Sequence, residues 1–149
     1  MSGIYLIVWD ELMKEKSFVL QSTKGGYPHC TLCYTGANVS KDKLIEVSNE
    51  AMKQFSMREM TLSLAYVNSF RQDDGIMRHD VLMEVKETVP LENFRQKHIY
   101  GLPNAGKIFT GKLHVTHGIF GSKEEAEERV LILNEKLPRT VIITGVTIE

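Results

Sequence analysis

The feature that most constrains the fold is an order of elements that occurs twice along the chain. Each half is predicted to contain a strand, a connecting segment, a strand carrying a His-x-Thr tripeptide, a helix and a final strand. The tripeptides are His29-Cys30-Thr31 and His114-Val115-Thr116. The predicted strands span residues 3–10, 27–35, 59–70, 78–87, 108–120 and 139–149. The halves do not match residue by residue, so the repeat lies in the pattern alone.

Serine N-caps mark the helices that follow the two tripeptides. Ser40 begins a helix that extends to about Phe55. Ser122 and Glu125 form a capping box for the second helix. Pro90 favours the first turn of a shorter helix, which is predicted to extend to about His98.

Length and element order together predict the architecture. A chain of 149 residues, 42% of them hydrophobic, suits one domain that can bury a core without a disulfide or a metal. We expect an α+β fold over residues 1–149, with two pseudo-symmetric lobes of mostly antiparallel sheet. The lobes cover roughly residues 1–70 and 71–149, with outer helices around a central cleft.

The charge balance argues against a protein that coats long nucleic acid. The net charge is −1 and the pI is about 6.5, whereas such proteins carry a clear positive excess. The N-terminal apolar run meets Asp10 and Glu11, which does not fit a signal peptide, and no apolar stretch reaches membrane-spanning length. We therefore expect a soluble, cytoplasmic protein with no membrane partner, in the host cytoplasm if the source is viral.

The two cysteines do not fit a disulfide or a zinc site. Cys30 and Cys33 lie three apart in one predicted strand, so their side chains are expected on opposite faces. No second cysteine pair completes a zinc site. We expect both thiols to be reduced.

Strand alternation divides each tripeptide between two faces. Side chains two apart share a face, so each histidine lies beside its own threonine and opposite the middle residue. The predicted faces are Tyr27, His29, Thr31 and Cys33 against Cys30, Leu32 and Tyr34, and Lys112, His114, Thr116 and Gly118 against Leu113, Val115, His117 and Ile119. If the two halves pack side by side, two imidazoles and two hydroxyls converge in one cleft.

Such a group suits cleavage of a phosphodiester bond. Histidine titrates near neutrality, so one imidazole can remove a proton from the attacking oxygen while the other protonates the leaving oxygen. Threonine hydroxyls can donate hydrogen bonds to the non-bridging oxygens. This chemistry needs no metal or other cofactor, and the sequence has no ligand cluster with the usual metal-site spacing.

The segments PHCTLCYTG and KLHVTHGIF resemble the paired H-x-[ST] motifs of the two-histidine (2H) phosphoesterase superfamily. The resemblance covers the whole chain in layout, although only the tripeptides and their apolar flanks are specific. It implies a bilobal α+β fold in which His29 and His114 are catalytic and Thr31 and Thr116 bind phosphate. The small size is most similar to viral members that destroy nucleotide immune signals, including phage anti-CBASS nucleases.

Four further residues are candidates for substrate binding. Tyr27 and Lys112 each precede a motif histidine by two residues, where they could stack on a base and neutralise phosphate. Tyr5, in the first strand, could also reach the cleft. Lys107 ends the match Gly101–Lys107 to G-x-x-x-x-G-K, but Ile108 replaces the Ser or Thr of a true P-loop. We therefore interpret this segment as a loop beside the cleft in which Lys107 could meet phosphate.

Other notable residues are given structural interpretations. Trp9 and Phe70 are assigned to core packing, although both could stack on bases. His117 is expected in a structural role on the face opposite His114. His79 and His98 are expected at the surface. Glu149 could orient a histidine, but a frayed terminus is preferred.

Three classes of function remain open at this point. The leading one is a metal-independent phosphodiesterase acting on a cyclic di- or trinucleotide immune messenger. Within the same chemistry, the alternatives are RNA ending in a 2′,3′-cyclic phosphate and a 2′–5′ oligoadenylate. The other classes are a non-catalytic protein that sequesters a nucleotide and a plain scaffold. The sequence leaves the oligomeric state and the roles of the two histidines open.

Overall fold

The computed structural model describes residues 2–14, 27–35, 39–102 and 112–149. Its strands are β1 (Ser2–Trp9), β2 (His29–Thr35), β3 (Glu59–Arg71), β4 (Met77–Val85), β5 (His114–Phe120) and β6 (Arg139–Ile148). Its helices are α1 (Lys41–Phe55), α2 (Val89–Phe94) and α3 (Lys123–Asn134), with a 3₁₀ helix η1 (Glu11–Lys14) and a π-helical turn η2 (Arg95–Ile99).

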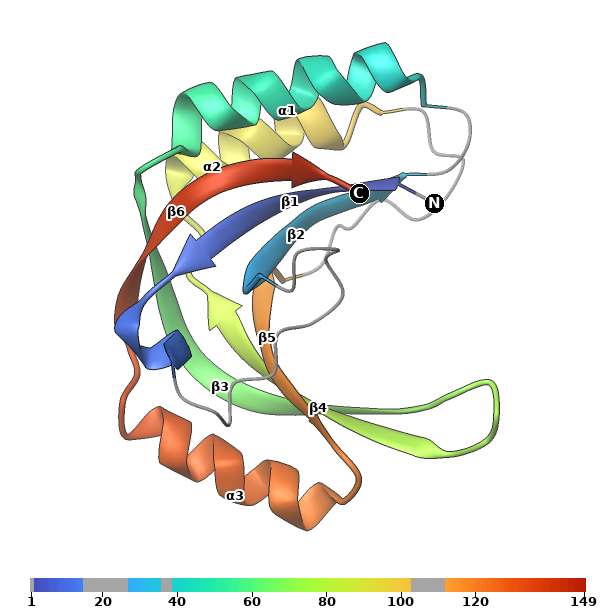
Figure 1. Cartoon of the computed structure of the whole chain (residues 1–149), viewed down its shortest axis with the longest axis vertical. Coiled ribbons are helices and arrows are strands. Elements are labelled where there is room, and N and C mark those ends of the chain that lie inside the picture. Colours follow the sequence, from blue (N-terminus) through green and yellow to red (C-terminus); the bar gives the residue numbers. More distant parts are fainter. Residues whose placement is uncertain (1, 15–26, 36–38, 103–111) are drawn as a thin grey trace.

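The six strands form one antiparallel sheet that closes on itself in the order β1-β2-β5-β4-β3-β6. Figure 1 shows the strong curvature of this sheet, with α1 and α2 on one side and α3 on the other. The α+β class and the antiparallel sheet are therefore confirmed. The termini lie side by side, because Gly3 and Glu149 exchange two backbone hydrogen bonds.

The strand order is unchanged when the two halves of the chain are exchanged. Replacing β1 by β4, β2 by β5 and β3 by β6, and the reverse, returns the same set of neighbouring pairs. The β-bulges in the strand pairs also correspond under this exchange. The extra residue of β2 against β1 corresponds to the extra residue of β5 against β4. The extra residue of β6 against β1 corresponds to the extra residue of β3 against β4. The element order predicted from the sequence thus reappears as a repeat in the topology.

The predicted serine caps begin the two long helices. Ser40 Oγ accepts a hydrogen bond from the backbone N–H of Lys43, and Ser122 Oγ accepts one from Glu125. Each cap satisfies one of the N–H groups that the first helical turn leaves without a partner. Among the described residues, no helix is long and apolar enough to span a membrane.

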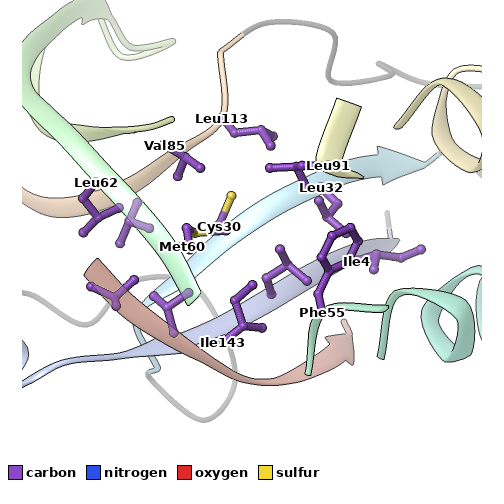
Figure 2. Packing of buried hydrophobic residues seen from close by; sticks show 14 of the residues in the cluster. Ile4, Cys30, Leu32, Phe55, Met60, Leu62, Val85, Leu91, Leu113 and Ile143 are labelled. Carbon is purple, nitrogen blue, oxygen red and sulfur yellow. The ribbon is translucent and has the colours of Figure 1, made fainter. Parts of the chain in front are cut away.

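The core is formed by buried side chains of the sheet together with those of α1, α2 and α3. Figure 2 shows side chains from strands and helices packed together, including Cys30 of β2, Met60 of β3 and Leu91 of α2. Phe55 at the end of α1 meets Phe94 of α2 edge to face, with ring centroids 5.3 Å apart. This apolar layer supports β2 and β5 from behind, so the opposite faces of these strands are left for polar side chains.

Several structural expectations are wrong. Trp9 and Phe70 are 41% and 38% exposed rather than in the core, because they lie near strand ends that extend beyond the packed layer. His79 is buried rather than at the surface, and its Nδ1 lies 2.7 Å from Ser69 Oγ on the neighbouring strand. Glu149 is not frayed, since its backbone pairs with Gly3.

The two thiols are expected to be unreactive in the folded protein. Both cysteines are fully buried, and burial raises the pKa of Cys30 to about 12 and that of Cys33 to about 11. Because the thiolate is the reactive form, an aromatic disulfide reagent at pH 8 should label neither thiol until the protein is unfolded in guanidinium. Rapid stoichiometric labelling of the native protein would contradict this placement.

Candidate functional site

The two His-x-Thr tripeptides meet at their centres. Among the described residues, β2 and β5 pair at one position, Cys30 opposite Val115, and these are the middle residues of the tripeptides. Antiparallel pairing therefore places His29 across from Thr116 and Thr31 across from His114. Cys30 and Val115 are fully buried in the core. The two histidines and two threonines, the His–Thr quartet, consequently lie together on the other face.

A cavity of about 270 Å³ opens over this quartet. It is lined by His29, Thr31 and Tyr34 of β2, Arg78 and Asp80 of β4, and His114 and Thr116 of β5. His29 and Thr31 are buried, and His114 and Thr116 are half-buried. The structure thus brings together all four residues that the sequence predicted to converge.

A β-bulge follows each tripeptide directly. Leu32 is the extra residue of β2 against β1, and His117 is the extra residue of β5 against β4. A bulge changes which side chains share a face beyond it. For this reason Cys33 is buried in the core and Tyr34 lines the cavity, the reverse of the predicted alternation. Cys30 and Cys33 therefore do not lie on opposite faces.

Both motif histidines are oriented by the same backbone contact. The Nδ1 atom of His29 lies 2.9 Å from the carbonyl oxygen of Tyr27, and that of His114 lies 3.4 Å from the carbonyl oxygen of Lys112. A carbonyl oxygen can only accept, so Nδ1 carries the proton in each contact. Nε2 is then the basic nitrogen of each neutral ring. The contact at His114 is longer and therefore weaker.

Burial favours the neutral form of His114. Desolvation lowers the pKa of His114 below its ordinary value, and the positive form of His29 acts in the same direction. The carbonyl of Lys112 and the carboxylate of Asp80 oppose this shift, since both stabilise the imidazolium. Both His29 and Asp80 are therefore near enough to His114 to influence its proton.

Arg78 and Asp80 are cavity residues that sequence reasoning missed. The guanidinium donates from Nε to Asp80 Oδ1 at 2.7 Å and from Nη2 to Asp80 Oδ2 at 3.1 Å. The Cζ atom of Arg78 also lies 5.2 Å from the centre of the Phe70 ring. The spacing Arg-x-Asp in a predicted strand placed both on one face, but only the pairing of β4 with β5 shows that this face is the one beside His114.

Tyr5 packs against His29 but is outside the lining of the cavity. Its ring meets the His29 ring edge to face at 5.2 Å and the Tyr34 ring at 6.1 Å. Burial raises the pKa of the Tyr5 hydroxyl, and Tyr34 and Glu149 add to the effect, so the phenol stays neutral. The ring lies back over Gly3, where a Cβ atom would come within 2.7 Å of the Tyr5 hydroxyl oxygen.

The other predicted binding residues are placed differently. Tyr27 is exposed and outside the cavity lining, and its part in the site is the carbonyl that accepts from His29. Lys112 is 74% exposed, and its Nζ lies 3.4 Å from Glu84 Oε1. Lys107 lies outside the described residues. His117 is fully buried and is outside the cavity lining.

The cavity contains residue types that bind metals, but not in a metal-binding group. Two imidazoles and the Asp80 carboxylate line it, and Asp80 is already paired with Arg78. Across residues 2–14, 27–35, 39–102 and 112–149, no three His, Cys, Asp or Glu side chains are grouped so that they could hold an ion.

No protein-family model matches the chain, and no curated protein matches it.

Replacing Gly3 should disturb the packing of Tyr5 against His29. In Gly3→Ala the new Cβ would lie 2.7 Å from the Tyr5 hydroxyl oxygen and 3.0 Å from the Cys33 carbonyl oxygen. The first contact is too short for any real Cβ atom, so the Tyr5 ring must move. We expect a loss of roughly 1–3 kcal/mol in the free energy of unfolding, the usual cost of overpacking. The matched control is Gly121→Ala, where a Cβ would meet open space. Equal denaturant midpoints for the two variants would contradict the close contact.

Proposed function

We propose that this protein is a metal-independent phosphodiesterase of the 2H type that cleaves a small nucleotide. The observation that carries the proposal is the centre-to-centre pairing of the two His-x-Thr tripeptides, which puts two imidazoles and two hydroxyls in one cavity. The preferred substrate is a cyclic di- or trinucleotide messenger. A 2′,3′-cyclic phosphate end and a 2′–5′ oligoadenylate are the alternatives within the same chemistry.

The quartet can supply each element of such a cleavage. One histidine accepts a proton through Nε2 from the attacking oxygen, and the other donates a proton to the leaving oxygen. The hydroxyls of Thr31 and Thr116 donate to the non-bridging oxygens, where negative charge develops. Because the cavity is partly shielded from water, these hydrogen bonds stabilise the transition state more than they would in solvent.

We assign the base to His114 and the acid to His29. A general base must be neutral before it accepts a proton, and burial favours the neutral imidazole of His114. His29 lies across the strand junction, so a phosphorus atom bound between the threonines has one imidazole on each side. This arrangement suits an in-line displacement.

The repeat in the topology supports membership of the 2H superfamily. The family resemblance implies two pseudo-symmetric lobes with one motif strand each. Exchange of the halves of this chain preserves the strand order and places a bulge directly after each tripeptide. Two lobes of about residues 1–70 and 71–149 would account for both features.

The size of the cavity favours a small ligand. About 270 Å³ lies just below the range of typical small-molecule pockets. It suits one phosphate with the adjoining sugar, and bases would extend beyond it toward the exposed rim. The chain's net charge of −1 likewise gives no broad electrostatic attraction for long nucleic acid.

The decisive experiment is a chromatographic screen for cleavage in excess EDTA. The substrates are cyclic dinucleotides, cyclic trinucleotides, 2′–5′ oligoadenylate and 2′,3′-cyclic nucleotides. We expect turnover of at least one, and a loss of about 10²–10⁴-fold in kcat for His29→Ala and for His114→Ala. His117→Ala is the control for loss of an imidazole outside the cavity, with its fold checked by circular dichroism.

Three results would contradict the proposal. Abolition of turnover by EDTA would indicate a metal enzyme. Tight nucleotide binding without turnover, unchanged in His29→Ala, would indicate a sequestering protein. Neither binding nor turnover across the screen would indicate a scaffold.

For a 3′–5′ linked substrate, the neighbouring 2′-hydroxyl is the expected nucleophile. Removing it should abolish cleavage, because the base then has no proton to take from the substrate. The test compares a ribonucleotide substrate with its 2′-deoxy analogue at equal concentration. Rapid cleavage of the deoxy analogue would instead indicate attack by water.

The assignment of the base predicts a change in pH dependence. The Asp80 carboxylate raises the pKa of His114, so Asp80→Asn should lower it. Activity would then be lost at a lower pH as the base becomes protonated, and the acidic limb of the kcat/KM profile should move to lower pH. Asp74→Asn, an exposed change of equal charge in the turn after β3, should leave the limb in place. A limb that stays in place or moves upward in Asp80→Asn would refute the assignment.

A further inference from the structure

The cavity extends along β4 beyond the His–Thr quartet. Thr116 of the quartet pairs with Leu82, and Arg78 lies four residues further along β4. At roughly 3.3 Å per residue, the two backbone positions are about 13 Å apart. Arg78 nevertheless lines the same cavity as Thr116. Because its guanidinium is bonded to Asp80, two residues nearer Leu82, the Arg78 side chain enters the cavity from the part of β4 that lies beyond the quartet.

Two contacts hold this guanidinium in one orientation. Asp80, two residues along the same strand, binds its Nε and Nη2 atoms. Phe70, the cross-strand partner of Arg78 in the pairing of β3 with β4, presents its ring to the guanidinium, with Arg78 Cζ over the ring at 5.2 Å from the centroid. A side chain fixed in this way loses little conformational entropy when it binds a ligand.

The same contacts leave one edge of the guanidinium for a ligand. Of the five N–H groups of an arginine side chain, the Asp80 carboxylate engages one on Nε and one on Nη2. Within the described part of the chain, Nη1 makes no hydrogen bond, and the Arg78 side chain is 33% exposed. The edge formed by Nη1 and Nη2 points away from the carboxylate, and it is the edge that binds phosphate oxygens in pairs.

We propose that Arg78 forms a second anion subsite, which binds a phosphate adjacent to the one that is cleaved. This inference rests on the proposed function, because it takes the quartet as the site of the scissile phosphate. It narrows the substrate to a nucleotide with at least two phosphates joined through a nucleoside. Oligonucleotides and cyclic oligonucleotides meet that condition, whereas a 2′,3′-cyclic mononucleotide does not.

Calorimetric binding of two non-cleavable nucleotides tests the subsite without turnover. Adenosine 3′-monophosphate carries one phosphate and adenosine 3′,5′-bisphosphate carries two, so only the bisphosphate can occupy both positions at once. We expect the wild-type protein to bind the bisphosphate about tenfold more tightly, the effect of one charge-assisted hydrogen bond. In Arg78→Gln that preference should disappear, while the affinity for the monophosphate stays within about twofold.

Arg71→Gln is the matched control. It removes the same charge from the same hairpin, but Arg71 donates to the Gly75 carbonyl oxygen and is outside the lining of the quartet cavity. This variant should keep the bisphosphate preference. If Arg71→Gln and Arg78→Gln reduce it equally, general electrostatics explains the effect and the subsite is refuted.

Phe70→Ala covers the case in which Arg78→Gln fails to fold. Phe70 is partly exposed, so its truncation leaves the charge and the ion pair with Asp80 in place. Because the guanidinium loses its contact with the Phe70 ring, the bisphosphate preference should fall severalfold. An unchanged preference in this variant would count against the subsite.

The remaining outcomes separate the two proposals. A wild-type protein that binds both nucleotides equally keeps the quartet as a phosphate site and refutes the Arg78 subsite alone. Equal loss of both affinities in Arg78→Gln would assign Arg78 to the scissile phosphate and also refute a separate subsite. A wild-type protein that binds neither nucleotide would overturn both proposals.

Discussion

The arrangement of the site depends on the contact between β2 and β5. These strands pair at Cys30 and Val115, and no other pair joins them in the described residues. Both side chains are fully buried in the core, so the contact is held by apolar packing from behind as much as by the ladder itself. Because these two residues are the centres of the tripeptides, the contact that closes the sheet also brings both histidines together. A shift of the register by one residue would turn one His-Thr pair into the core.

The two β-bulges determine which further side chains lie beside the quartet. Leu32 and His117 each follow a tripeptide threonine directly and interrupt the alternation there. A bulge increases the local twist and re-aims the side chains beyond it. At β2 the result is that Tyr34 reaches the cavity and Cys33 enters the core. The bulge in β2 thus adds Tyr34 to the polar lining of the cavity, while the quartet stays on the face opposite the core.

Much of this fold could be predicted from local sequence patterns. The six strands, the helix caps at Ser40 and Ser122 and the shared face of each histidine and its threonine depend on short-range signals. The convergence of the two His-Thr pairs was expected only if the repeated halves pack side by side, and it rests on the non-local pairing of β2 with β5. The placement of Tyr34 could not be predicted, because a bulge is defined only by the strand opposite. Arg78 and Asp80 were missed for a related reason, since their role depends on the non-local pairing of β4 with β5. Phe70 was misassigned because hydrophobicity alone does not show where a hairpin leaves the core.

The symmetry of the quartet contrasts with the asymmetry of the cavity walls. By the exchange of halves, Tyr5, which pairs with Thr31, corresponds to Leu82, which pairs with Thr116. Two residues before these stand Gly3 on β1 and Asp80 on β4. One wall is therefore aromatic, with Tyr34 in the lining and Tyr5 packed behind it against His29, and the other is ionic, with Asp80 and Arg78. Proton transfer in two directions needs two similar imidazoles, whereas a nucleotide has an apolar base at one end and an anionic phosphate at the other. Unequal walls around an equal quartet would allow such a ligand to bind in one orientation, and that orientation decides which histidine acts as the base.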